Sequence, residues 1–186
     1  MIHYNTINEQ LRSALNLLMS EEVFRPFRLV GGTALSLQIG HRESIDIDLF
    51  TDAPYGSVDF DAIDACLNRL FSLVDHSRGL IPGMGKSYFI SENPNDPSST
   101  VKLDVFYSND PFMQPVVEDD QIRMASIEEI IAMKIDVVQR GGRKKDFWDI
   151  HALLGQYNIP EMIELHQQRY EWTHERTTIL NNFLED

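Results

Sequence analysis

The fold is decided by one stretch, residues 29–50, which read LVGGTALSLQIGHRESIDIDLF. Its last part, residues 45–50, alternates apolar and polar side chains, which is typical of a half-buried β-strand with a period of two residues. Asp46 and Asp48 are therefore expected on the same face. Two ionised carboxylates about 4 Å apart repel by roughly 4 kcal/mol at an effective dielectric near 20. The pattern thus favours a cation between them, above all Mg²⁺, which prefers oxygen ligands.

The first part of the stretch predicts a phosphate-binding turn. Gly31, Gly32 and Thr33 follow a short apolar strand and are expected to form a tight turn, with a short helix over residues 34–39. Glycine lets the backbone approach a ligand closely, and the amides at a helix N-terminus attract phosphate. A Gly-Gly turn alone is mostly a turn, and an Asp-x-Asp pair alone is mostly a solvated strand face. Their order and close spacing favour a joint site for phosphate and metal.

This combination resembles a known family. The sequence GGTAL at 31–35, followed by GHRESIDIDLF at 40–50, is similar to the AbiEii/AbiGii family, the nucleotidyltransferase-like toxins of type IV abortive-infection systems. These toxins belong to the DNA polymerase β-like nucleotidyltransferase superfamily, whose pattern is a glycine turn, an Asp-x-Asp strand and a third carboxylate on a later strand. The resemblance implies that Asp46 and Asp48 are catalytic metal ligands.

The third carboxylate is expected at Asp104. Residues 101–107, VKLDVFY, form an alternating, β-rich run with Asp104 at the centre. Lys102 and Asp104 share one face of this strand, so Asp104 can join the Asp46 and Asp48 site if the two strands are neighbours. Without the other two aspartates, a solvent-facing position would be the preferred interpretation of Asp104.

A second block of the family pattern lies towards the C-terminus. In the family, a helical lysine, a basic turn and a Lys-Asp-x-x-Asp helix complete the active site, and the resemblance assigns Lys134 to the nucleotide phosphates and Asp146 to the polar part of the catalytic site. The alternative for Asp146 and Asp149 is capping of a helix N-terminus, worth roughly 0.5–2 kcal/mol. Arg42 is either a triphosphate contact or a solvated residue at the strand entry.

The resemblance implies transfer of a nucleoside monophosphate from an NTP, with one or two Mg²⁺ ions, to an acceptor hydroxyl. RNA is the implied acceptor, with tRNA acceptor ends as one class, and a cognate antitoxin is the implied protein partner. Arg140, Arg143, Lys144 and Lys145 are expected to receive the RNA backbone. Two rival interpretations stay open: nucleotidyl transfer to a small molecule such as an aminoglycoside, and a domain of the same fold that binds a nucleotide or a partner without turnover.

Composition sets further bounds. The net charge of −13 argues against general attraction to nucleic acid, although residues 140–145 hold four of the 16 Lys and Arg side chains. A single cysteine, Cys66, excludes an internal disulfide framework. The N-terminus lacks the features of a signal peptide and no apolar run approaches the roughly 20 residues of a membrane span, so a cytoplasmic location is expected.

For the fold, we expect an α/β protein with a small mixed, twisted sheet flanked by helices. Residues 1–122 are expected to form the nucleotidyltransferase core, and residues 123–186 a helical C-terminal part that completes the site. Apolar spacing predicts amphipathic helices over 6–18 and 58–74, and a short edge strand is expected at 115–117.

Overall fold

The computed structural model describes residues 1–76 and 84–184. In these residues, one twisted mixed sheet runs in the order β3-β4-β5-β2-β1-β7-β6. β2 is parallel to β5 and β1 is parallel to β7, whereas the other neighbours are antiparallel. The expected mixed α/β class is confirmed. The strands are β1 (Arg28–Val30), β2 (Asp46–Thr51), β3 (Leu73–His76), β4 (Gly85–Ser91), β5 (Val101–Tyr107), β6 (Val117–Asp119) and β7 (Ile122–Met124).

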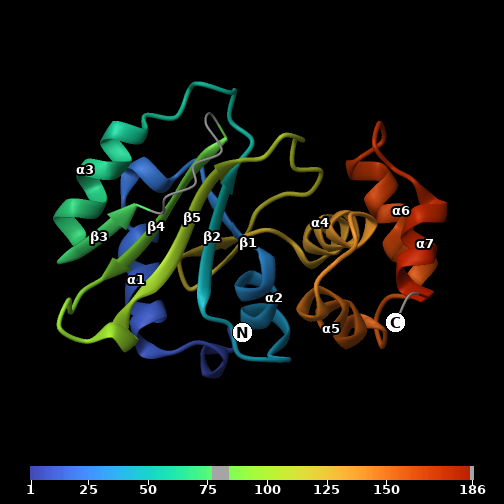
Figure 1. Cartoon of the computed structure of the whole chain (residues 1–186), viewed down its shortest axis with the longest axis horizontal. Helices are drawn as coiled ribbons and strands as arrows, with labels where there is room; N and C mark the ends of the chain where they lie inside the picture. The colour runs from blue at the N-terminus through green and yellow to red at the C-terminus, as the bar shows by residue number, and fades with distance from the viewer. Residues whose placement is uncertain (77–83, 185–186) are drawn as a thin grey trace.

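The helices form two groups around this sheet. Figure 1 shows α1 and α3 beside β3, β4 and β5, while α4 to α7 gather together beyond α2. None of the helices in the described ranges is both long enough and apolar enough to cross a membrane. The helices are α1 (Glu9–Met19), α2 (Gly31–Ile39), α3 (Phe60–Leu70), α4 (Ile127–Gln139), α5 (Lys144–Leu153), α6 (Ile159–Arg169) and α7 (Arg176–Leu184), with short 3-10 helices at Tyr4–Thr6, Glu22–Phe24 and Pro97–Ser99.

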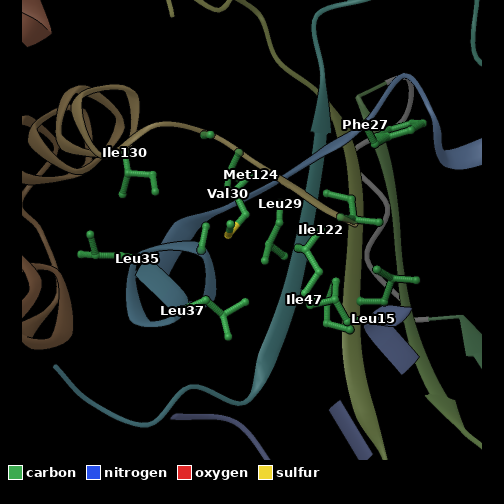
Figure 2. Packing of buried hydrophobic residues seen from close by; sticks show 14 of the residues in the cluster. Leu15, Phe27, Leu29, Val30, Leu35, Leu37, Ile47, Ile122, Met124 and Ile130 are labelled. Atoms are coloured by element: carbon green, nitrogen blue, oxygen red, sulfur yellow. The ribbon is translucent and has the colours of Figure 1, made fainter. Parts of the chain in front are cut away.

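The central strands are anchored by their apolar face. Ile47 and Leu49 of β2 are fully buried, as are Leu103 and Val105 of β5, while the residues between them face the other side. Figure 2 shows Ile47 packed near side chains from α1, β1 and β7. Because a strand alternates its side chains, burying this apolar set fixes which face carries the aspartates.

The predicted helix boundaries need correction at two places. α1 begins at Glu9 rather than Thr6, because the side chain of Asn8 accepts a hydrogen bond from Leu11 N at 2.8 Å and caps the helix. α3 ends at Leu70, and the expected continuation through Val74 is wrong. Val74 belongs to β3 and pairs with Ile90 of β4. β3 exposes most of its side chains, so it lacks the alternation that marks a half-buried strand.

Candidate active site

The register between β2 and β5 brings the three predicted metal ligands together. The two strands are parallel, and Asp48 and Asp104 are direct partners across the pair, while Asp46 is the partner of Lys102. All four side chains lie on the face opposite the buried Ile47. The alternation that buries the apolar residues therefore gathers three carboxylates and one ammonium on one patch of the sheet.

This patch is electrostatically strained. Burial, together with the charges of Asp104 and Asp46, raises the pKa of Asp48 to about 6. Lys102 Nζ donates a hydrogen bond to Asp104 Oδ2 at 3.0 Å, which offsets part of the negative charge. Asp104 Oδ1 is buried, and none of the residues in ranges 1–76 and 84–184 offers it a hydrogen-bond partner. A buried acceptor without a donor is costly, so this oxygen is suited to a ligand.

The glycine turn is built into the first turn of α2, which begins at Gly31 itself rather than after Thr33. Gly31 has a φ of +72°, and a Cβ there would lie 2.7 Å from Asp48 Oδ2. At Gly32, a Cβ would clash with the guanidinium of Arg42. Both positions therefore need glycine for close packing, and the start of α2 lies directly against the carboxylate patch.

Thr33 faces the interior of the fold, and it does not line the cleft that the carboxylate patch borders. Its side chain is buried, lies 2.7 Å from Ser44 Oγ, and donates a hydrogen bond to the carbonyl oxygen of Asp46. These contacts tie the first turn of α2 to the start of β2. The hydroxyl of Thr33 thus holds the glycine turn against the Asp-x-Asp strand.

A buried ionic network adjoins the glycine turn. Arg42 donates from Nε to Asp149 Oδ1 at 2.6 Å and from Nη2 to Asp149 Oδ2 at 2.9 Å, and His41 Nε2 lies 2.7 Å from the same Oδ1. Burial would raise the pKa of Asp149, but the hydrogen bonds from His41 and Arg42 and the charge of Lys134 hold it well below its usual range. Asp149 is therefore the centre of this network.

Lys134 joins this network from α4. Its Nζ lies 2.7 Å from Asp149 Oδ2 and 2.9 Å from Asp146 Oδ1, and Arg143 Nε donates to Asp146 Oδ2 at 2.9 Å. Three full cations, Arg42, Lys134 and Arg143, thus share two carboxylates, which leaves a net positive charge beside the aspartate patch. A positive excess of this kind favours a bound anion.

One cleft with a volume of about 700 Å³ borders the carboxylate patch, the two glycines and the ionic network, although His41 and Asp149 do not line it. The cleft is lined by every predicted site residue except Thr33, and by Arg140, Arg143 and Lys145 of the basic turn. Six acidic and six basic side chains line it. The formal charge of the cleft is therefore near zero in a chain of net charge −13, so the cleft is far more positive than the rest of the protein.

A family model described as nucleotidyl transferase AbiEii toxin, of the type IV toxin–antitoxin system, matches residues 14–186. The chain belongs to this AbiEii family. Its class of activity is accordingly nucleotidyl transfer, as the family resemblance implied.

Other proteins share the sequence or the fold of this AbiEii-family chain. An uncharacterized protein of Aquifex aeolicus (strain VF5) is 27% identical over 173 residues, which cover 88% of this chain and 76% of that protein. The crystal structure of JHP933 from Helicobacter pylori has a TM-score of 0.59 at 20% identity, covering 95% of this chain and 76% of JHP933. The nucleotidyltransferase toxin MenT4 of Mycobacterium tuberculosis has a TM-score of 0.52 at 12% identity, covering 85% of this chain and 64% of MenT4. These structures confirm the nucleotidyltransferase fold.

The donor set of the AbiEii-family chain fits a divalent cation. In residues 1–76 and 84–184, no group of three or more His, Cys, Asp or Glu forms a ready-made metal cage. Mg²⁺ rarely uses such a cage, because it takes one or two carboxylates and completes its octahedron with water and substrate phosphates. The unpartnered Oδ1 of Asp104 and the raised pKa of Asp48 mark the place where such a charge would be stabilised.

Sequence reasoning missed part of this site. Asp149 was considered as part of the Lys-Asp-x-x-Asp helix, with helix capping as the alternative, but it was not named among the site residues, although its spacing of three residues from Asp146 places both carboxylates on one face of α5. Lys144 does not line the cleft, since its ammonium lies 5.0 Å from the ring centroid of the exposed Trp148. Asp136 and Tyr170 also line the cleft. No sequence motif marked these two residues.

Proposed function

We propose that this AbiEii-family nucleotidyltransferase moves a nucleoside monophosphate from an NTP to an acceptor hydroxyl, with Mg²⁺ held by Asp46, Asp48 and Asp104. The direct pairing of Asp48 with Asp104, beside a glycine turn that packs against Asp48, carries this proposal. When bound, the metal would lower the pKa of the acceptor hydroxyl and neutralise charge on the phosphates. The chain's own contribution is to place these charges before the substrate arrives.

The phosphate groups are assigned to the positive side of the cleft. Gly31 and Gly32 present the start of α2, where backbone N–H groups favour anions. In this proposal, Arg42 and Lys134 act mainly as fixed charges, because their donors already bind Asp149 and Asp146. Asp146 in turn holds Lys134 and Arg143 at the cleft wall, which makes it a positioning residue.

The proposal also divides the chain into two functional parts. Residues 1–122 would supply the carboxylates and the glycine turn, and residues 123–186 would supply Lys134, Asp146 and the basic turn. β7, which spans Ile122–Met124, joins the two parts through the sheet. Because NTPs and the acceptor proposed below are found inside the cell, the proposal places the protein in the cytoplasm.

We further propose that the acceptor is RNA, with tRNA acceptor ends as one class, and that a cognate antitoxin protein controls the activity. The RNA acceptor is supported by the cations at the cleft. Arg140, Arg143 and Lys145 line it, and Lys144 lies just outside beside Trp148. Cations that neutralise phosphates, next to an exposed aromatic ring, suit single-stranded nucleic acid. A cationic aminoglycoside fits such a rim less well.

Calorimetric titration with each NTP in the presence of Mg²⁺ tests the donor site. We expect metal-dependent binding of at least one NTP by the wild-type protein. Asp48→Asn combined with Asp104→Asn should weaken it by more than about 100-fold, since even outer partners of metal sites cost roughly 10- to 100-fold. Asp75→Asn, an exposed aspartate on edge strand β3, is the matched control and should bind normally. Failure of folded wild-type protein to bind any NTP at millimolar concentration would overturn the proposal.

The acceptor is tested by label transfer. The protein is incubated with Mg²⁺ and each NTP labelled at the α-phosphate, together with either total tRNA or a panel of aminoglycosides. Label on tRNA that depends on Asp48 supports the RNA proposal. Label on an aminoglycoside alone would contradict it and would establish the small-molecule activity instead.

A further inference from the structure

The cleft has a second wall that the phosphate and metal residues do not use. α4 presents Met133 and Val137 on one face, its C-cap Arg140 continues the same helical spacing, and Asp136 also reaches the cleft. Tyr170 follows the end of α6 and lies in the same lining. Figure 1 shows α4 and α6 side by side, away from the inner strands β2 and β5 that carry the aspartates. This wall combines apolar side chains, one aromatic ring, one carboxylate and the guanidinium of Arg140.

Asp136 is held rigidly in this wall. Arg140 Nη2 donates to Asp136 Oδ2 at 2.7 Å, and His166 Nε2 lies 3.2 Å from Asp136 Oδ1. Although burial raises the pKa of Asp136, the hydrogen bond from His166 and the charge of Arg140 lower it overall, so the carboxylate is ionised. An ionised carboxylate only accepts hydrogen bonds. The side chain is therefore a fixed acceptor at the cleft surface.

The support behind Asp136 is itself buried and ordered. His166 is fully buried, and its ring stacks on Tyr170 with centroids 4.9 Å apart. Because Asp136 is ionised, His166 must donate from Nε2. His166 Nδ1 then lies 2.7 Å from His174 Nδ1, and one proton between these two nitrogens completes the chain. The chain fixes the ring of His166 and, through it, the carboxylate of Asp136.

A carboxylate is badly suited to the phosphates of an NTP, because like charges repel. It is well suited to the hydrogen-bond donors of the nucleoside, which are the ribose hydroxyls and the exocyclic amines of the bases. Met133 and Val137 offer apolar contact, and the Tyr170 ring offers a flat surface, both of which suit a sugar and a base. The chemistry of the second wall thus complements the half of the substrate that the first wall leaves open.

We propose that Asp136 binds the nucleoside part of the NTP by accepting a hydrogen bond from a ribose hydroxyl or an exocyclic amine. His166 is its positioning residue. The inference rests on the proposed function, because it assigns one more contact to the same NTP. It predicts that removing the charge of Asp136 weakens recognition of the nucleoside and leaves recognition of the polyphosphate intact.

The test compares two probes, each titrated with Mg²⁺: the NTP that binds the wild-type protein, and inorganic tripolyphosphate. Asp136→Asn should weaken NTP binding by about 10- to 100-fold, the usual loss for a hydrogen bond to a charged group, and leave tripolyphosphate binding unchanged. Glu128→Gln is the matched control. It removes one carboxylate from the same helix, but Glu128 bonds the Tyr157 hydroxyl and lines a different groove. This variant should bind both probes normally.

Two arms identify the donor group. In the first arm, the 2′-deoxy form of the NTP is titrated into the wild-type protein. If its affinity falls to that of the ribose NTP for Asp136→Asn, the donor is the ribose 2′-hydroxyl. If instead the order of preference among the four NTPs changes in Asp136→Asn, the donor is an exocyclic amine. His166→Gln, which removes the support but keeps the carboxylate, should give a smaller loss of NTP affinity and the same tripolyphosphate affinity.

The outcomes distinguish a failure of the proposed function from a failure of the assignment of Asp136. Wild-type protein that binds neither probe would overturn the proposed function itself. Wild-type protein that binds both probes, with unchanged NTP affinity in Asp136→Asn, would overturn only the assignment of Asp136. Equal loss of both probes in a folded Asp136→Asn would also overturn it. If Asp136→Asn does not fold, an unchanged NTP affinity in folded His166→Gln has the same meaning.

Discussion

Arg42 donates hydrogen bonds to both carboxylate oxygens of Asp149, which lies 107 positions further along the chain. This pair connects the entry of β2 to α5, and Lys134 of α4 joins it through Asp149 Oδ2. The entry of β2 therefore meets the consecutive helices α4 and α5, which are distant from it in sequence, at one buried carboxylate. The junction adjoins the cleft, because Arg42 and Lys134 both line it.

Removing the carboxylate of Asp149 should lower the free energy of unfolding. Asp149→Ala leaves Arg42 without its carboxylate partner, and leaves Lys134 with Asp146 alone, in a site where the Asp149 side chain is fully buried. Breaking a buried ion pair by removing one partner costs about 3–5 kcal/mol. We expect that decrease in the free energy of unfolding, measured by urea denaturation. Asp75→Ala, an exposed residue, should stay within about 0.5 kcal/mol of the wild type. A loss below about 1 kcal/mol in Asp149→Ala would contradict the central role of this residue.

A methyl group at Gly31 should damage both backbone and site. Gly31→Ala places an L side chain at a φ of +72°, and its Cβ would lie 2.7 Å from Asp48 Oδ2. Gly56→Ala is the matched control, because Gly56 has a φ of +82° and a Cβ there meets nothing within 4 Å. Both variants should lose about 1–2 kcal/mol of stability from the backbone alone. Only Gly31→Ala should also lose Mg²⁺-dependent NTP binding in calorimetry. Equal NTP binding by the two variants would show that close packing on Asp48 is unnecessary.

The pKa of Asp48 gives a stability prediction with a defined sign. Its value of about 6 lies above that of an unfolded aspartate, about 3.9, so the folded state binds more protons between these pH values. Stability without metal should therefore fall as the pH rises from about 4 to about 6. The difference corresponds to roughly 3 kcal/mol, and because Asp48 also faces the cleft we expect about 1–3 kcal/mol.

The measurement is urea denaturation of the metal-free protein across this pH range. Asp48→Asn removes the titrating group, so it should be more stable than the wild type at pH 8 and equally stable below pH 4. Asp75→Asn should follow the wild type throughout. If Asp48→Asn is destabilised at pH 8, the ionised Asp48 does not carry the strain assigned to it.

The sequence predicted the site best where local pattern and chemistry coincide. Asp46, Asp48 and Asp104 sit on strands whose alternation fixes their faces, so their convergence needed only that β2 and β5 be neighbours. Lys134 was harder. The family resemblance assigned it to the nucleotide phosphates, but its partners, Asp146 and Asp149, depend on how α4 packs against α5. That packing follows from tertiary contacts across the turn between the helices, which no periodicity encodes.

The short strands show the same limit. β7 has three residues, and its place beside β1 is fixed by a single register pair, Leu29 with Met124. A run of that length carries too little alternation to be identified before its neighbour is known. The predicted edge strand at 115–117 was close, since β6 spans Val117–Asp119 and lies at the edge of the sheet.

The basic turn gives the last prediction, which concerns salt. If Lys144 and Lys145 neutralise RNA phosphates, Lys144→Gln with Lys145→Gln should reduce the slope of log K against log salt by about 1.4, at roughly 0.7 for each single-strand contact. Arg25→Gln with Arg176→Gln removes the same charge from exposed positions outside the cleft and should leave the slope unchanged. Fluorescence anisotropy with labelled tRNA between about 50 and 200 mM salt measures both slopes. Equal slopes in the two double variants would mean that Lys144 and Lys145 do not neutralise RNA phosphates, and would contradict the RNA contact proposed for the basic turn. With a net charge of −13, the chain as a whole repels RNA, so any attraction must come from a local group of cations. A local effect of the turn is therefore the outcome that the charge distribution favours.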